Sequence, residues 1–193
     1  CIPGCDSIEA TGDNAYELRT VHNPWRNGRN VIAVSSVTPA GCAAAVERLV
    51  AILAGQAGNA VGPLIEVSPA PAPLDDAAEA KELAKVTAEG SSRTMGGIAA
   101  SYADRYFTSG QGAWARLFLA AMRRLDALHA AEGDASDLRT CRYLFLQLDR
   151  IEEGPAFGDA ERRELTDLFL RLAARMPYSR SKEHTPAIPH GND

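Results

Sequence analysis

The chain has 193 residues and a net charge of −5, with 46% hydrophobic and 23% charged residues, close to the globular average. This balance excludes a wholly disordered chain. It also argues against nucleic acid or an anionic membrane surface as the main partner, because either requires a clustered basic face. No apolar run approaches the ~20 residues that cross a bilayer, so no membrane span is expected.

The cysteines leave several interpretations open. Cys1 is either the first residue of a piece of a longer protein or the lipidated residue of a mature lipoprotein; the missing polar tether after it favours the first. A disulfide between Cys1 and Cys5 is a further alternative. Cys42 and Cys141 fall on apolar helix faces, which predicts buried thiols. Since no second close pair completes a zinc set, no metal is expected. No cofactor is expected either.

Two strands are predicted near the start of the chain. Strand-forming and polar residues alternate at Tyr16–Val21, which predicts a half-buried strand. The continuous apolar run Val31–Val34 predicts a strand covered on both faces. Residues 22–30 contain Asn-Pro and Asn-Gly turn signals, so the strands are expected to form a hairpin with a long tip. Trp25 in this tip is either a plug between two parts of the chain or an exposed contact residue, and the plug is favoured.

A helix and a third strand are predicted next. Thr38 followed by Pro39 is typical of a helix start, and Gly55 is typical of its end. The helix is expected to bury one apolar stripe, formed by Cys42, Val46, Leu49, Val50 and Leu53. Leu64–Val67 reads as a short strand, and strand, helix and strand at this spacing fit a right-handed crossover. Residues 1–69 are therefore predicted to form a small α/β domain.

Alternating prolines at positions 69, 71 and 73 predict a stiff linker over residues 70–74, or a rigid surface loop between parts that still pack together. Residues 75–193 are predicted to form a helical domain, in which a 3.6-residue period runs to about residue 176 and residues 178–193 form a polar loop without periodicity. Helices are predicted at about 76–89, 94–107, 113–131, 136–153 and 159–176, with Asp76 and Glu79, Ser136 and Asp159 as caps. The short loops between them predict antiparallel helix pairs.

Apolar residues at helical spacing predict the buried faces of these helices. They are Ile98, Tyr102 and Tyr106; Trp114, Leu117, Phe118, Met122, Leu125 and Leu128; Leu138, Cys141, Leu144, Phe145, Leu148 and Ile151; and Leu165, Leu168, Phe169 and Leu172. The predicted fold class is thus α+β, a small unit of about three strands and one helix followed by helix pairs.

Candidate binding groups are sparse. No nucleophile elbow, phosphate loop or dinucleotide fingerprint occurs. Trp114, Tyr102, Tyr106 and Tyr143 could form a platform for sugar rings, but their helical spacing favours the core. Glu152 and Glu153 are adjacent, so they point about 100° apart and are expected to be a solvated helix end. The C-terminal segment holds the set predicted to bind substrate. Its members are Arg180, His184, His190 and Asn192, which combine proton transfer with carboxylate recognition.

Several segments together resemble a known family. They are Tyr16–Trp25, Gly28–Ile32 and Gly41 before an Ala-rich helix, then Tyr106–Gly110 leading to Trp114, and Leu148–Glu153 followed by Phe157 and Asp159. They resemble the small α/β segment and the first hairpins of the helical toroid in large bacterial proteins similar to heparinase II/III-like and alginate-lyase-like polysaccharide lyases.

The resemblance implies an α/α toroid that holds an acidic polysaccharide. Such lyases remove the proton α to a uronate carboxylate and eliminate the glycosidic oxygen; an Asn or Arg neutralises the carboxylate, and a His or Tyr moves protons. The chain is then expected to be the extracytoplasmic N-terminal part of a polysaccharide-degrading enzyme. It is expected to be inactive alone, because five helices do not close a toroid. The alternative is a non-catalytic helical interaction or carbohydrate-binding module of the cell envelope.

Overall fold

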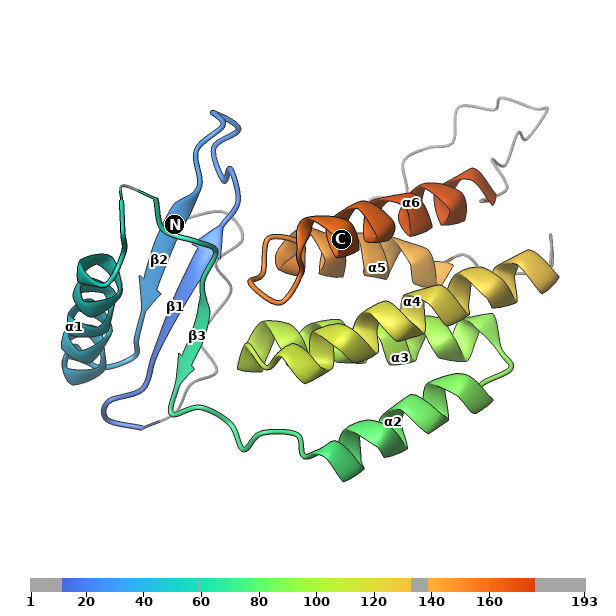
Figure 1. Ribbon diagram of the computed structural model, residues 1–193, viewed down its shortest axis with the longest axis horizontal. Coiled ribbons are helices and arrows are strands. Elements are labelled where there is room, and N and C mark those ends of the chain that lie inside the picture. The colour runs from blue at the N-terminus through green and yellow to red at the C-terminus, as the bar shows by residue number, and fades with distance from the viewer. Residues whose placement is uncertain (1–11, 59, 133–138, 176–193) are drawn as a thin grey trace, which may run out of the picture.

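The computed structural model describes residues 12–58, 60–132 and 139–175. In this part of the chain a three-stranded sheet lies between one helix and an array of further helices (Figure 1). The strands are β1 (Tyr16–Val21), β2 (Val31–Ser35) and β3 (Ile65–Ser68), and the helices are α1 (Pro39–Ala54), α2 (Asp76–Ala88), α3 (Ser92–Ser109), α4 (Gly112–Glu132), α5 (Arg139–Ile151) and α6 (Asp159–Arg175). The predicted α+β class is confirmed.

The sheet has the order β2-β1-β3, and β1 pairs antiparallel with both neighbours. Leu18 in β1 lies opposite Val34 in β2 and Glu66 in β3. The strands β2 and β3 are therefore parallel to each other but separated by β1. The predicted strand–helix–strand unit is present, and its helix α1 connects two strands that do not touch.

The strand order corrects two predictions about burial. The central strand β1 is covered on both faces, because Leu18 packs against α1 while Arg19, its neighbour in the chain, is also buried. It was expected to be half-buried. The strand β2 was expected to be covered on both faces, yet it is an edge strand in which Ala33 is the buried residue.

The helix α1 begins as predicted, but it buries a different face. Thr38 is the N-cap, and its hydroxyl accepts a hydrogen bond from the Gly41 amide at 3.0 Å. The face against the sheet carries Gly41, Ala44, Ala45, Leu49 and Ile52. Gly41 lies so close to the carbonyl oxygen of Ala15 that a side chain there would overlap it. Small residues thus let the helix backbone approach the sheet.

The predicted inward stripe of α1 is therefore wrong in all but one position. Leu49 is partly buried, whereas Val46, Val50 and Leu53 are about half exposed on the outer side of the helix. Cys42 is also exposed and carries a free thiol, contrary to the prediction of a buried one. The side chain of Cys141 lies outside the described residues, as do Cys1 and Cys5.

The segment between the sheet and α2 is hydrogen-bonded to the α3–α4 turn. The Gln111 side-chain amide donates to the carbonyl oxygens of Pro71 at 3.1 Å and Ala72 at 2.9 Å, and it accepts from the Leu74 amide at 3.0 Å. Gly110 precedes it in the left-handed conformation, with φ at 69°. The alternating-proline segment thus lies on the helical array, while the division into domains at residues 69 and 75 stays a prediction.

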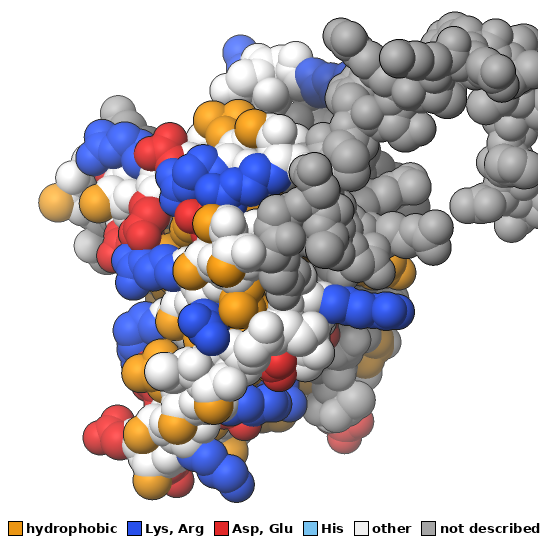
Figure 2. Space-filling model, turned by 90° about the vertical axis from the view of Figure 1, so that its right-hand side faces the viewer, with side chains coloured by type: hydrophobic (Ala, Val, Ile, Leu, Met, Phe, Trp, Pro, Cys, Tyr) orange, Lys and Arg blue, Asp and Glu red, His pale blue; other side chains and the backbone are white. Residues whose placement is uncertain are grey.

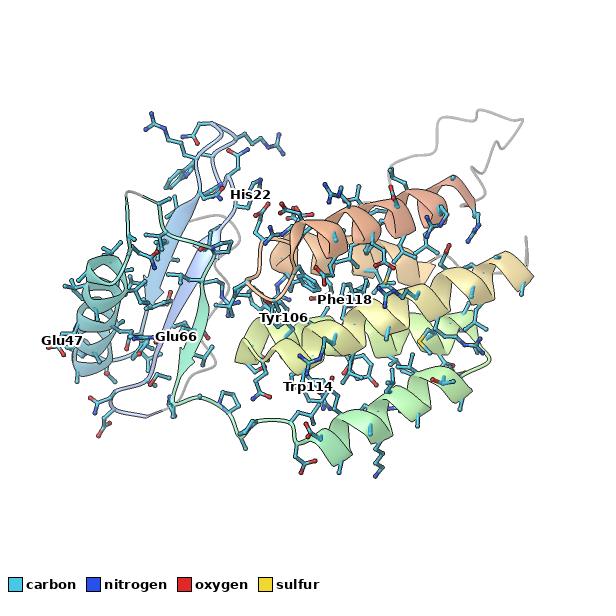
Figure 3. All side chains as sticks on the ribbon, viewed as in Figure 1. His22, Glu47, Glu66, Tyr106, Trp114 and Phe118 are labelled. Atoms are coloured by element: carbon cyan, nitrogen blue, oxygen red, sulfur yellow. The ribbon has the colours of Figure 1, made fainter. Side chains whose placement is uncertain are left out.

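The helical array is built on one apolar core. The inward faces predicted for α4 and α6 are buried throughout and are confirmed. In α5, Leu144 and Ile151 are buried, but Phe145 is 38% exposed and lies against Phe169. Tyr106 and Phe118 point into the layer between the helices (Figure 3), and the Tyr106 hydroxyl accepts a hydrogen bond from the Ala156 amide at 3.0 Å.

Two predicted caps are displaced by one position. Asp75, and not Asp76, caps α2, since its carboxylate accepts from the Ala78 amide at 2.7 Å. In α6, Asp159 is the first helical residue, and Glu161 folds back to accept from the Gly158 amide at 2.9 Å. The predicted cap Ser136 lies outside the described residues. Such shifts follow from runs of acidic and small residues in which several positions can serve as the cap.

None of the described helices is long and apolar enough to span a bilayer. On the face drawn in Figure 2, lysine and arginine side chains are interleaved with acidic and hydrophobic ones.

Candidate binding site at the junction of sheet and helices

A cavity of about 360 Å³ lies where the β1–β2 hairpin meets the helical array. We call it the junction cavity. Its wall is mostly polar and is drawn from β1, the hairpin tip, α3 and the end of α5. The lining residues are Arg19, Thr20, Val21, His22, Asn23, Pro24, Arg26, Phe107, Asp149, Arg150 and Glu153. Cavities between two structural units are common ligand sites.

Asparagine side chains shape the hairpin tip. The Asn23 side-chain oxygen accepts from the Gly28 amide at 2.7 Å, and the Asn30 side-chain oxygen accepts from the Asn23 amide at 3.2 Å. Asn23 and Arg26 adopt positive φ values of 38° and 54°, a conformation that asparagine tolerates well and arginine seldom adopts. The folded tip brings the residues that follow β1, namely His22, Asn23, Pro24 and Arg26, to the wall of the junction cavity.

Two guanidinium groups lie against one aromatic ring in the cavity wall. The guanidinium carbons of Arg19 and Arg150 are 3.6 Å and 3.7 Å from the centre of the Phe107 ring. Arg19 also pairs with Glu17 at 3.2 Å. Arg150 lies 3.6 Å from Asp104. Each of these cation–π contacts is worth roughly 0.5 to 2 kcal/mol. The Phe107 ring therefore helps to hold both guanidinium groups in the cavity wall.

Carboxylates line the side of the cavity formed by the end of α5. Glu153 Oε1 lies 3.3 Å from His22 Nδ1, so the two side chains form an ion pair when His22 is protonated. Figure 3 shows His22 between the hairpin and the turn that follows α5. Burial raises the pKa of Glu152, and the nearby charges of Asp149 and Glu153 raise it further.

The structure separates the predicted site residues. Arg180, His184, His190 and Asn192 lie outside the described residues, so their role stays a prediction. Glu153 lines the cavity and its neighbour Glu152 does not. Both lie in the turn after Ile151, where α5 ends, so the predicted helix end at residue 153 is two residues too late. The expectation of a merely solvated helix end is wrong, because Glu153 is paired with His22 and Glu152 is partly buried.

The aromatic residues considered as a sugar platform lie in different environments. Tyr102, Tyr106 and Trp114 belong to the core, as their spacing favoured, while Tyr143 is 68% exposed. The favoured interpretation of Trp25 as a plug is wrong, because its ring is 55% exposed at the hairpin tip. Trp25 lies between Pro24 and Arg26, which both line the junction cavity.

Sequence reasoning missed the central residues of this site. Arg19 occupies the polar phase of the β1 alternation, which faces solvent in a half-buried strand. Phe107 and Arg150 come from helices far along the chain, and no local pattern places them beside β1. The one signal in the sequence is Arg19 itself, a charged residue in the middle of β1, which is the central strand of the sheet.

Within residues 12–58, 60–132 and 139–175, no group of three or more His, Cys, Asp or Glu side chains is arranged to hold a metal ion. Comparisons with protein-family models, with curated proteins and with solved structures returned no match.

Proposed function

We propose that this chain is the substrate-holding leading part of a polysaccharide-degrading protein, and that the junction cavity binds a carboxylate-bearing sugar. The observation that supports this proposal is the concentration of arginine in a mostly polar cavity. Arg19, Arg26 and Arg150 all line it, and they come from the strand, the hairpin tip and the helical array. Guanidinium groups match the planar geometry of a carboxylate and bind it through two parallel hydrogen bonds.

Arg26 is the group best placed to meet a ligand. It is exposed at the cavity rim, and no carboxylate of the described residues forms an ion pair with it. His22 and Asn23 beside it supply further hydrogen-bonding groups suited to sugar hydroxyls. The acidic residues opposite, Asp149 and Glu153, can accept hydrogen bonds from those hydroxyls.

The exposed ring of Trp25 supports a sugar ligand over a free anion. A large apolar ring that is 55% exposed beside a polar cavity offers a flat surface for the C–H face of a second sugar unit. A ligand longer than one sugar would then contact both the cavity and the tip.

The eliminative reaction implied by the family resemblance belongs to this proposal as an activity of a longer chain. The cavity holds one histidine beside Glu153 and guanidinium groups that could neutralise a uronate carboxylate. A base would take the proton α to the carboxylate, and the electrons of that C–H bond would form the double bond. The C–O bond to the glycosidic oxygen would break, and this oxygen would take up a proton from an acid. Because such polymers lie outside the cytoplasm, an extracytoplasmic location is part of the same proposal.

The test is a binding titration of the whole chain by calorimetry. We expect uronate oligosaccharides, such as oligogalacturonate and oligoalginate, to bind at least ten times more tightly than neutral oligosaccharides of the same length. Arg26→Gln should weaken uronate binding about tenfold or more, because a charge-assisted hydrogen bond is worth roughly 1.5 to 3 kcal/mol.

A matched control lies three residues away. Arg29 is exposed on the same hairpin tip but does not line the cavity, so Arg29→Gln should change the affinity less than about twofold. Equal losses in the two variants, or neutral sugars binding as well as acidic ones, would contradict the proposal. Ultraviolet-absorbing unsaturated products from a longer chain would favour the lyase, while binding without products would favour the non-catalytic module.

A further inference from the structure

A second hollow lies on the other side of α3, between α2 and α3, with a volume of about 490 Å³. We call it the α2–α3 groove. Arg105 lines this groove and Phe107 lines the junction cavity. Residues two apart on a helix point about 200° apart, so α3 separates the two spaces. The α2–α3 groove is therefore distinct from the site proposed above.

The groove has an excess of positive charge in a chain whose net charge is −5. Lys85, Arg93 and Arg105 line it, against the single carboxylate of Glu82. Glu82 is already engaged, because it accepts a hydrogen bond from the Tyr102 hydroxyl at 2.7 Å and lies 3.6 Å from the Lys85 ammonium. The Tyr102 hydrogen bond is the main reason that the pKa of Glu82 is lowered, so this carboxylate is charged and occupied near neutral pH.

Arg105 is held by an aromatic ring instead of an acid. Its guanidinium carbon lies 4.6 Å from the centre of the Trp114 ring, and Trp114 stacks on Tyr102 with ring centres 5.8 Å apart. Figure 3 shows Trp114 between α4 and α2. Among the residues that the structure describes, no carboxylate lies within ion-pair distance of Arg105. A stacked guanidinium keeps its hydrogen-bonding edges available to an oxyanion.

Small residues keep the groove open along α3. Gly97 and Ser101 precede Arg105 at intervals of four residues, so all three lie on one side of the helix. A Cβ atom added at Gly97 would meet no other atom within 4 Å. The space above this side is therefore not filled by the packing of α2.

We propose that the α2–α3 groove binds an oxyanion, a carboxylate, sulfate or phosphate, with Arg105 as its bidentate partner and Lys85 as a second cation. The ordered Glu82–Tyr102–Trp114 contacts fix these cations before the ligand arrives, which lowers the entropy lost on binding. The oxyanion is either a free ion or a group borne on an elongated polar ligand, since the groove is open along its length.

The experiment is a nuclear magnetic resonance titration of the whole chain that follows the amides of Gly97 and Ser101. The probes are inorganic sulfate, inorganic phosphate, a sulfated oligosaccharide and a neutral oligosaccharide of the same length. We expect saturable shifts at these amides with the anionic probes only. If the sulfated oligosaccharide binds more tightly than sulfate, the ligand is glycan-borne, and equal affinities indicate a free oxyanion.

Four variants complete the test. Arg105→Gln should weaken binding at least tenfold, whereas Arg163→Gln, which changes an exposed arginine on α6, should change it less than twofold. Gly97→Leu should block the groove without lowering the melting temperature, because its side chain enters open space. Unchanged affinity in both Arg105→Gln and Gly97→Leu, or no saturable shift with any anionic probe, would overturn the proposal. Arg26→Gln should leave these shifts intact, which separates this site from the junction cavity.

Discussion

At the scale of single residues, the wall of the junction cavity contains a buried charge. Arg19 is 6% exposed in the middle of a strand, a position where an arginine is costly unless its charge is balanced. Glu17 supplies an ion pair and Phe107 supplies the electron-rich face of a ring. Removing the Glu17 carboxylate would take away one of the partners of this buried charge, so a change at Glu17 alone is expected to destabilise the fold.

The stability of the fold is expected to depend on pH through Glu152, and the direction follows from the surroundings of this carboxyl group. Burial, aided by Asp149 and Glu153, raises the pKa of Glu152, so the folded state disfavours the ionised carboxylate. The stability linked to Glu152 is fully present when the pH is below the pKa of this group in the unfolded chain. It falls as the pH rises through the raised pKa of the folded state. Glu152→Gln should therefore raise the melting temperature near neutral pH, and the gain should vanish in acid.

Thermal unfolding followed by circular dichroism at several pH values checks this expectation. Glu47→Gln is the control, because Glu47 is exposed on the outer side of α1 (Figure 3). A gain that is the same at every pH, or a loss of stability at neutral pH, would show that Glu152 is better accommodated as an ion than its surroundings indicate.

At the scale of elements, sequence patterns located the strands and helices but did not always find the buried face. Large apolar residues predicted the faces of α4 and α6 correctly, because these helices pack on other helices through bulky side chains. The same logic failed for α1, where close approach to the sheet selects Gly41 and Ala45 and leaves Val46 and Val50 outside. Periodicity cannot separate these cases, since both faces of α1 are apolar.

One substitution made in two helices should have opposite effects. Gly97→Ala in α3 places a methyl group in open space and should stabilise the fold by about 0.5 to 1 kcal/mol, through better helix propensity. Gly41→Ala in α1 drives the same methyl group into the Ala15 carbonyl and the Ser36 hydroxyl, and should cost about 1 to 3 kcal/mol.

Chemical denaturation of both variants measures the two free energies of unfolding. The pair controls for the intrinsic preference of alanine over glycine, which is common to both helices. If Gly41→Ala were also stabilising, α1 would have to stand farther from the start of β1 than its contacts with Ala15 indicate.

At the scale of the whole molecule, one side chain makes three hydrogen bonds to the segment that connects the sheet and the helices. The prolines predicted a stiff segment, but no local pattern could show that it lies on the α3–α4 turn. That contact depends on Gln111, which is about 40 residues away in sequence from the carbonyl groups that it binds. The junction cavity was missed for the same reason, since its walls meet only after the chain has folded.

Gln111→Ala should release this segment without unfolding the helices. The Leu74 amide donates to the Gln111 side chain in the folded protein, so its hydrogen exchange should become at least tenfold faster in the variant. The Ala78 amide, which donates to Asp75, should exchange as before. Gln56→Ala, at an exposed position after α1, serves as the control. Unchanged protection of Leu74 would mean that the segment is held by other contacts.

The turn beside Gln111 has a consequence for recognising related chains. Gly110 has a φ of 69°, and a Cβ atom there would lie 2.6 Å from the Ile65 carbonyl oxygen. Glycine is therefore favoured at this position both by the backbone conformation and by the close approach of β3. Gln111 is required by the proline segment. A Gly-Gln pair between two helices, with alternating prolines about 40 residues before it, is therefore a compact sequence signature. Chains that carry it are expected to join their sheet and helices in the same way, even where the rest of their sequences has diverged.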